Sequence, residues 1–412
     1  MQTNLADLYK GTRDGAEAEA ILRKCVHCGF CTATCPTYQL LGDELDGPRG
    51  RIYLIKQVLE GHAATRKTQS HLDRCLTCRN CESTCPSGVD YGRLVDIGRK
   101  IVAAQVPRAG TDRLKRTLLA RGLNSPLFAP AMKLGQAMRW AVPAGLKAKV
   151  PAPQAAGARP APRHARRMLL LEGCVQNAMA PNINNAAARV LDRLGVSLVA
   201  APGAGCCGAL NHHLDFQDAG LDNMRRNIDA WWPAIAAGEV EALAMTASGC
   251  GVMVRDYGHL LAADARYAEK AARVSAMTRD LSELVIAEPG LPALLARARG
   301  AAAPRRIAYH PPCTLQHGQQ VRGKAEQVLR DAGFELVPVA EAHLCCGSAG
   351  AYSVLNPEIS TQLRDRKLAH LEAAAPEAIC SANIGCLTHL QSGTATPVRH
   401  WVEVIDDLLA QA

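Results

Sequence analysis

The sequence contains few aromatic residues and no hydrophobic run long enough to cross a membrane. Phe, Trp and Tyr make up 4% of the 412 residues, which argues against binding of nucleic-acid bases by stacking. No stretch approaches the roughly 18 apolar residues of a transmembrane helix, and the N-terminus lacks the pattern of a secretory signal. We therefore expect a cytoplasmic protein without disulfides, either soluble or bound peripherally to a membrane.

Acidic residues are almost absent from one long segment. Between Arg99 and Arg167, fifteen Lys and Arg residues stand against one acidic residue, Asp112, so this segment carries a formal charge of +14. The whole chain carries +9, and the remainder is therefore net acidic. Two interpretations stay open: the segment faces an acidic subunit or the anionic cytoplasmic leaflet, or it is a solvated linker.

Cysteine, by contrast, is abundant, with 17 residues. Two runs share the spacing C-x2-C-x2-C-x3-C-P, which is typical of bacterial ferredoxins that hold two 4Fe-4S clusters. In such ferredoxins the fourth cysteine of each run binds the other cluster. The pattern predicts one cluster on Cys25, Cys28, Cys31 and Cys85 and another on Cys75, Cys78, Cys81 and Cys35. A zinc site is not favoured, because it needs two cysteine pairs set well apart.

Periodicity and composition divide the chain into four segments. Residues 1–104 have helical patterns around the cysteine runs and predict an α-helical, ferredoxin-like domain. Residues 105–167 begin as a basic helical segment and pass into a linker rich in Pro and Ala. Residues 168–300 and 301–412 alternate strands with helices, which predicts parallel sheets. The expected fold class is therefore α+β and multidomain.

The clearest elements can be placed individually. We expect helices at 51–60, 92–104 and 184–194 and strands at 168–171, 196–200 and 242–246. One long helix is expected between the Cys-Cys-Gly motif at 206–208 and residue 232.

The last two segments repeat one cysteine-rich α/β unit. R-V-L-D-R-L-G-V-S-L-V at 189–199 corresponds to Q-V-L-R-D-A-G-F-E-L-V at 327–337, and Cys-Cys-Gly occurs at 206–208 and 345–347. The candidate binding residues are Cys174, Cys206, Cys207 and Cys250 in the first unit and Cys313, Cys345, Cys346 and Cys386 in the second. Cysteines that follow parallel strands gather at the carboxyl edge of a sheet, where such folds place their sites. An additional iron–sulfur centre, a redox-active thiol set and a purely structural cluster all stay open.

Three other features receive weaker interpretations. Gly203, Gly205 and Gly208 match a dinucleotide-binding pattern. The equivalent residues of the second unit, 341–347, keep the two cysteines but lack the first two glycines of this pattern, so we reject a flavin or nicotinamide site. Cys380 has no counterpart in the first unit and is expected to be a plain buried thiol. The nearby histidines are interpreted as polar rim residues rather than ligands: His212, His213, His310 and His317.

Long stretches of the sequence resemble the iron–sulfur subunits of bacterial glycolate oxidase (glycolate dehydrogenase). They include V-H-C-G-F-C-T-A-T-C-P-T-Y-Q-L-L-G-D-E-L-D-G-P-R-G-R-I-Y-L-I-K-Q-V-L-E-G (26–61), C-L-T-C-R-N-C-E-S-T-C-P-S-G-V (75–89), N-I-D-A-W-W-P-A-I (227–235), T-A-S-G-C-G (246–251) and H-L-C-C-G-S-A-G (343–350). The resemblance spans nearly the whole chain and is loosest at 140–167. One departure from the wider family matters: Ala247 and Asn383 stand where heterodisulfide reductase-like members have a fifth cysteine.

The resemblance implies an electron-transfer subunit with no catalytic residue of its own. It implies that FAD lies only in partner subunits, the flavin-containing glycolate oxidase subunits that oxidise glycolate to glyoxylate. The present chain would pass their electrons to a quinone or another acceptor, at the cytoplasmic face of the inner membrane. Three alternatives stay open: an equivalent subunit for lactate or glycerol-3-phosphate, a heterodisulfide reductase-like catalyst, and a non-catalytic scaffold.

Overall fold

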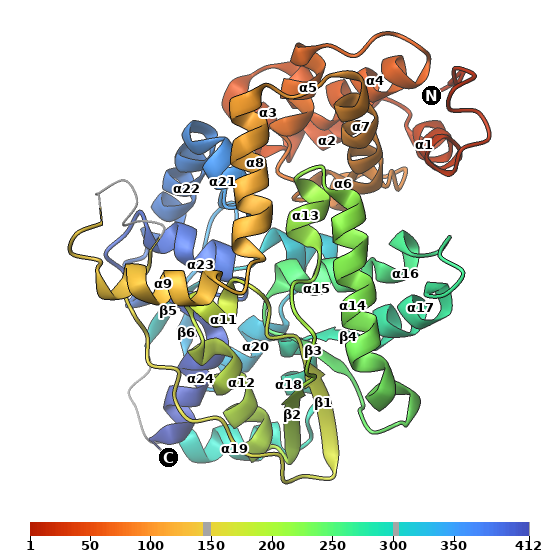
Figure 1. The fold of residues 1–412 in the computed structure, drawn as a ribbon. Helices are drawn as coiled ribbons and strands as arrows, with labels where there is room; N and C mark the ends of the chain where they lie inside the picture. Colours follow the sequence, from red (N-terminus) through yellow and green to blue (C-terminus); the bar gives the residue numbers. More distant parts are fainter. Residues whose placement is uncertain (143–149, 300–304, 412) are drawn as a thin grey trace. The chain divides into compact units, whose positions relative to one another are not determined.

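The computed structural model describes residues 1–142, 150–299 and 305–411, and Figure 1 shows their order along the chain. Contacts divide the chain into two compact units. The N-terminal unit comprises residues 1–117 and 343–367, and the repeat unit comprises residues 118–342 and 368–412. This division does not test the boundaries of the four predicted segments, which stay a prediction.

The N-terminal unit is helical. Its helices are α1 (Arg13–Lys24), α2 (Phe30–Ala33), α3 (Pro36–Leu41), α4 (Pro48–Leu59), α5 (Arg66–Asp73), α6 (Asn80–Thr84) and α7 (Tyr91–Gln105). The helices predicted at 51–60 and 92–104 are therefore confirmed as α4 and α7. These two helices pack closely, because Gly98 leaves room for Ile55: a Cβ at Gly98 would lie 2.5 Å from the Ile55 side chain. Their buried faces, with Ile55 and Leu94, form one hydrophobic core.

A segment from late in the chain completes this unit, which the sequence did not predict. The Asn80 side chain donates a hydrogen bond of 3.1 Å to the carbonyl of His343. The Tyr352 hydroxyl, on α21 (Tyr352–Leu355), donates one of 3.1 Å to the carbonyl of Arg74. Residues 343–367, including the second Cys-Cys-Gly motif, therefore belong with the N-terminal helices.

The repeat unit contains two four-stranded parallel sheets with the same strand order, β2-β1-β3-β4 and β6-β5-β7-β8. The strands are β1 (Arg166–Leu170), β2 (Val196–Ala200), β3 (Leu243–Met245), β4 (Thr278–Asp280), β5 (Arg306–His310), β6 (Glu335–Leu336), β7 (Ala378–Ser381) and β8 (Val398–His400). The predicted parallel sheets and the internal repeat are thus confirmed.

Helices flank both sheets. They are α9 (Phe128–Ala137), α11 (Gln176–Met179), α12 (Asn182–Arg193), α13 (Ala209–His213), α14 (Gln217–Ala236), α15 (Ser248–Arg255), α16 (Tyr257–Leu260), α17 (Ala268–Met277), α18 (Leu281–Ala287), α19 (Leu291–Ala298), α20 (Lys324–Asp331), α23 (Ile384–Gln391) and α24 (Trp401–Ala410). Two further helices, α8 (Gly110–Leu123) and α22 (Pro357–Glu372), span the boundaries between the units.

Two predictions about helices have different outcomes. The helix predicted at 184–194 is confirmed as α12, and Gly195, with a φ of 80°, follows its end. The prediction of a single long helix after the first Cys-Cys-Gly motif is wrong, because the chain forms two helices there, α13 and α14. Asp215, between them, adopts a positive φ of 71°, which an α-helix does not accommodate. The linker predicted at 143–167 lies partly outside the described residues.

The two repeats interlock reciprocally. Helix α12 of the first repeat packs on α24 of the second, and α20, the counterpart of α12, packs on α18, the counterpart of α24. A hydrophobic core that includes Ile183, Leu191, Trp401 and Ile405 therefore continues through both repeats. At its edge the Arg189 guanidinium pairs with the Asp406 carboxylate at 2.7 Å.

Equivalent residues cap α18 and α24. Asp280 caps α18, and His400 caps α24 in the same capping-box arrangement. The Nδ1 atom of His400 accepts a hydrogen bond from the Val402 N–H at 3.2 Å, and its Nε2–H donates to the carbonyl of Thr246 at 3.0 Å. Burial lowers the pKa of His400 from its ordinary value of 6.5 to about 3. The neutral ring thus uses both nitrogens to join the two repeats.

This arrangement predicts a loss of stability in acid. The contribution of His400 is fully present above the pKa of the unfolded chain, near 6.5, and is lost as the pH falls toward the pKa of the folded state. Asn caps helices well but does not titrate. His400→Asn should therefore reduce the pH dependence of the unfolding free energy by up to about 1.4 kcal/mol per pH unit between about pH 6 and pH 5. Anaerobic urea unfolding, followed by Trp fluorescence, measures this difference, and parallel profiles would contradict it.

Candidate metal centres

One predicted set of four cysteines surrounds a small cavity in the N-terminal unit. Cys25, Cys28, Cys31 and Cys85 all line this hollow, whose volume is about 30 Å³. Burial, with smaller contributions from the neighbouring Cys25, Cys85 and Cys28, raises the pKa of the Cys31 thiol to about 11. Cys81 of the other set lines the same hollow, so cysteines of both runs meet here, and the assignment of four of them to one cluster stays a prediction.

The other predicted set is more deeply buried. Burial raises the pKa of Cys81 well above its ordinary value, and the sulfurs of Cys78, Cys75 and Cys35 add to this effect. Cys35, Cys75 and Cys81 are all buried. The structure therefore also brings together the cysteines of the second predicted set.

The backbone of both runs follows the same course. The third residue of each run, His27 or Thr77, has a positive φ, as does the residue after the second cysteine, Gly29 or Arg79. Such a turn directs backbone N–H groups toward sulfur, and the Thr77 N–H lies 3.4 Å from the Cys75 Sγ. A left-handed residue with a side chain costs roughly 1–2 kcal/mol, and Arg79 bears this cost at the position where the first run has Gly29.

Two buried arginines lie beside the second set, and sequence reasoning did not find them. The Arg51 side chain is 1% exposed and donates to the carbonyl of His71 at 2.7 Å. Burial by itself would lower the pKa of Arg51, but Tyr91, Cys75 and Cys35 raise it above its ordinary value. Arg99, 9% exposed, donates to the carbonyl of Cys75 at 2.7 Å.

These cations compensate thiolate charge in a dry environment. Arg51 is also paired with the buried carboxylate of Asp46, at 3.4 Å. Arg49, near Cys31 of the first set, is paired with Glu44 at 2.6 Å and is 34% exposed, so solvent weakens its effect. The two sets therefore lie in different electrostatic environments. The sequence did offer one signal for such a residue: Arg51 is a charged residue at a position of α4 where the helical period predicts burial.

The four cysteines of the first repeat converge within the repeat unit. They follow the carboxyl ends of β1, β2 and β3, as the strand pattern predicted. Cys206 is in hydrogen-bond contact with Cys174 and Cys207, and these contacts lower the pKa of its thiol. Cys207 in turn contacts Cys250, and its own pKa is raised. The structure thus brings together all four predicted residues as one thiol set.

Glycine after each vicinal cysteine pair is required by the backbone. Gly208 has a φ of 91°, and its N–H lies 3.4 Å from the Cys206 Sγ. A Cβ at this position would lie 2.7 Å from the carbonyl oxygen of Gly220. Gly347 repeats this geometry, with a φ of 87° and an N–H 3.4 Å from the Cys345 Sγ. Both Cys-Cys-Gly motifs therefore direct a backbone donor at a sulfur.

The cysteines of the second repeat are divided between the two compact units. Cys313 and Cys386 belong to the repeat unit, and Cys345 and Cys346 belong to the N-terminal unit. All four are buried. Their role as one binding site stays a prediction. The Asn383 side-chain amide lies 3.5 Å from the Cys386 Sγ.

The remaining candidates can be placed individually. Cys380 is fully buried in β7, and burial raises the pKa of its thiol to about 12, consistent with a plain buried thiol. The interpretation of the histidines as rim residues is wrong for His212, His310 and His317, whose exposed fractions are 8%, 1% and 5%. Among the four histidines, His213 alone is exposed.

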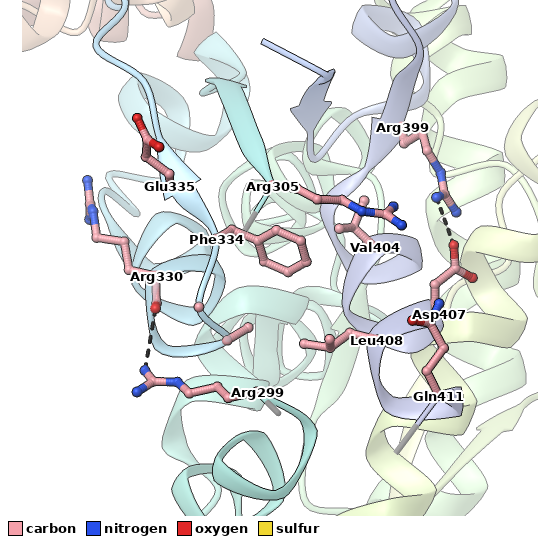
Figure 2. Close-up of a pocket in the computed structure, with 12 residues that line it drawn as sticks. Arg299, Arg305, Arg330, Phe334, Glu335, Arg399, Val404, Asp407, Leu408 and Gln411 are labelled. Carbon is pink, nitrogen blue, oxygen red and sulfur yellow. Dashed lines mark hydrogen bonds and ion pairs between the residues drawn. The ribbon is translucent and has the colours of Figure 1, made fainter. Parts of the chain in front are cut away.

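A larger hollow in the repeat unit does not involve these sites. This pocket has a volume of about 390 Å³. Figure 2 shows its lining residues, among them Phe334, Val404 and Leu408. Its arginines are Arg299, Arg305, Arg330 and Arg399. It lies at the amino end of β5, whereas the cysteines follow carboxyl ends of strands. None of the described residues that line it is a cysteine, and we assign it no part in metal binding.

Comparison with known protein families agrees with this arrangement. A 4Fe-4S dicluster domain matches residues 21–89, and a cysteine-rich domain matches residues 168–255 and again residues 307–391. The fold and sites therefore define an iron–sulfur protein in which a domain with two 4Fe-4S clusters precedes two cysteine-rich domains.

Similar proteins narrow this class. The chain is 54% identical to the glycolate oxidase iron–sulfur subunit of Escherichia coli (strain K12), over 99% of both chains. It is 30% identical to the probable glycolate oxidase iron–sulfur subunit of Bacillus subtilis (strain 168), over 91% of this chain and 89% of that one. Lactate utilization protein A of Geobacillus thermodenitrificans is 26% identical over 58% of this chain and 98% of its own length. The chain belongs to the family of glycolate oxidase iron–sulfur subunits.

The buried arginine predicts a difference between the two clusters. Reduction adds negative charge, which a nearby buried cation stabilises, so Arg51→Gln should lower the midpoint potential of the cluster beside Cys75 by on the order of 50 mV. Arg49→Gln is the matched control, since both arginines pair with a carboxylate, and it should shift the other cluster less because Arg49 is partly solvated whereas Arg51 is buried. Redox titrations followed by EPR measure both potentials. An equal shift of both clusters in Arg51→Gln would contradict the prediction.

The geometry of the first Cys-Cys-Gly motif predicts that a substitution at its glycine removes iron from the first repeat alone. If Cys174, Cys206, Cys207 and Cys250 bind a centre, the anaerobically purified chain should contain more iron and sulfide than two 4Fe-4S clusters supply. Gly208→Ala should remove this excess and leave the rest. Gly238→Ala is the control, since Gly238 also has a positive φ of 68° but a Cβ there meets nothing within 4 Å. Iron and sulfide counts equal to two clusters in the unmodified chain would contradict the prediction.

Proposed function

We propose that this chain is the electron-transfer subunit of a glycolate oxidase complex. The observation that carries the proposal is the convergence of two complete four-cysteine sets in a chain that is 54% identical, over 99% of its length, to a glycolate oxidase iron–sulfur subunit. Flavin-containing subunits would oxidise glycolate to glyoxylate, and this chain would pass the electrons toward a quinone or another acceptor.

We propose that the two sets hold the two clusters in the crossed arrangement. Cys25, Cys28, Cys31 and Cys85 would bind one cluster, and Cys75, Cys78, Cys81 and Cys35 would bind the other. Each cluster, when bound, accepts and gives up one electron at a time. The protein contributes burial, N–H donors such as Thr77, and the cations Arg51 and Arg99, which together determine how readily each site holds the added charge.

A catalytic role for the cysteine-rich repeats has less support. Ala247 precedes α15 and offers no ligand atom in its side chain. Asn383 offers an amide, which already contacts the Cys386 sulfur. Neither position therefore supplies a fifth thiolate. We propose that the repeats extend the electron path, with the set formed by Cys174, Cys206, Cys207 and Cys250 as the candidate for an additional iron–sulfur centre.

The partners and location follow from the same proposal. FAD would reside in the partner subunits, since the chain has no convincing dinucleotide-binding motif. None of the helices in the described ranges is long and apolar enough to cross a membrane. Electron delivery to a quinone would then require peripheral contact with the cytoplasmic face of the membrane. A lactate-linked role is less favoured, because lactate utilization protein A matches only 58% of this chain.

The relay role predicts the effect of removing one ligand. Cys81→Ser should abolish glycolate-dependent dye reduction by the assembled complex, while glycolate still reduces the flavin of the partner. Cys380→Ser is the control, because Cys380 is an equally buried cysteine outside the proposed ligand sets. Stopped-flow flavin absorbance and steady-state dye reduction separate the two steps. Dye reduction that survives in Cys81→Ser would refute the relay.

A further inference from the structure

Exposed hydrophobic side chains are concentrated in one part of the repeat unit. Twelve large hydrophobic residues are exposed in the part of the chain that the structure describes. Five of them lie between residues 118 and 140: Leu118, Leu127, Leu134, Met138 and Trp140. Single exposed apolar residues are ordinary, but a contiguous group indicates an interaction surface.

The group follows one face of α9. Leu127, Ala131, Leu134 and Met138 are all exposed and recur at the spacing of a helical face. Leu127 is 73% exposed and Leu134 is 62% exposed. Gln136 is the one buried residue of α9, and α9 packs against α11. Figure 1 shows α9 beside α11 at the margin of the repeat unit. This helix therefore presents its apolar stripe to the outside.

Positive charge surrounds this stripe without any negative charge in the same segment. No acidic residue occurs between Asp112 and Glu172. Lys133 and Arg139 are exposed beside the stripe. Trp140, next to Arg139, is 81% exposed. Basic side chains flanking exposed Leu and Trp on a helix are the features of a segment that lies in the surface of an anionic bilayer.

We propose that α9 and the turn after it form a membrane-docking surface that binds the headgroup region of an anionic lipid bilayer. Leu127, Leu134 and Trp140 would enter the acyl boundary, and Lys133 and Arg139 would contact lipid phosphates. A protein partner is less favoured, because cores of protein interfaces are depleted in Lys and the segment offers no acidic group to pair with cations of a partner.

The position of this surface gives it a role in the proposed relay. Helix α9 packs on α11, which begins two residues after Cys174. In the same segment, the side chain of Asn124 donates to that of Asn211, on α13, which follows the first Cys-Cys-Gly motif. The docking surface is thus anchored to the thiol set of the first repeat. This inference rests on the peripheral location proposed above but not on electron transfer itself.

Vesicle sedimentation with the full-length, cluster-loaded chain tests the proposal. The chain should bind vesicles of phosphatidylethanolamine and phosphatidylglycerol more tightly than vesicles of phosphatidylcholine, and added salt should weaken the binding. Lys133→Gln/Arg139→Gln should weaken it by about 25-fold, since each basic residue near an anionic surface contributes about five-fold. Leu127→Ser/Leu134→Ser should weaken it by at least about 100-fold if both side chains are fully inserted.

Matched controls come from elsewhere on the chain. Arg305→Gln/Arg330→Gln removes the same charge from the pocket in Figure 2, and Leu8→Ser/Leu41→Ser removes two exposed leucines from the N-terminal unit. Both controls should bind vesicles as the unmodified chain does. Equal weakening by the controls, or no preference of the unmodified chain for anionic vesicles, would overturn the proposal.

Activity in solution separates this proposal from the relay. The α9 variants should keep glycolate-dependent dye reduction in the assembled complex without vesicles, because a water-soluble dye needs no bilayer. Variants that bind vesicles normally but fail to assemble with the flavin subunits would show that α9 is a protein interface and would overturn the proposal. A relay that fails while vesicle binding persists would count against the proposed function alone.

Discussion

The N-terminal unit depends on bringing sulfur ligands together at sites where most of them are buried or half-buried. Eight cysteines converge there, and each thiolate that binds iron needs a compensating positive charge or a hydrogen-bond donor. Arg51 and Arg99 supply charge near Cys75, and the Thr77 N–H supplies a donor. Helix packing around these groups, including the close contact of Gly98 with Ile55, holds the cations beside the sulfurs. The fold of this unit and its binding of the clusters therefore depend on the same helix packing.

The repeat unit is built differently, from two copies of one cysteine-rich α/β unit. Each repeat has a four-stranded parallel sheet and a Cys-Cys-Gly turn, and the exchange of helix contacts between repeats creates one hydrophobic core. Duplication has nevertheless left the two halves unequal. An aspartate, Asp280, and a histidine, His400, cap equivalent helices, and the first thiol set lies within one unit whereas the second is divided between two. Equivalent sequence motifs thus need not perform equivalent roles.

Local sequence rules were sufficient for much of the fold. The helices α4, α7 and α12 have hydrophobic periods that match their buried faces, and β2 lies where its short apolar run predicted a strand, so the pattern and the structure agree. The failures have local causes as well. The break between α13 and α14 occurs at Asp215, a positive-φ residue that no periodicity signals. Three histidines near the cysteines are buried, although their polarity suggested a rim.

The sequence by itself determined the class of the protein, the two cysteine runs and the internal repeat, because ligand spacing and hydrophobic period are local properties of a chain. Only the tertiary structure decided which side chains surround the sulfurs. Arg51 and Arg99 reach Cys75 through helix packing, and residues 343–367 join the N-terminal helices across more than 200 positions of sequence. The outward direction of the stripe on α9 is also a tertiary property, since an apolar helical face reads the same in sequence whether it faces a core or solvent.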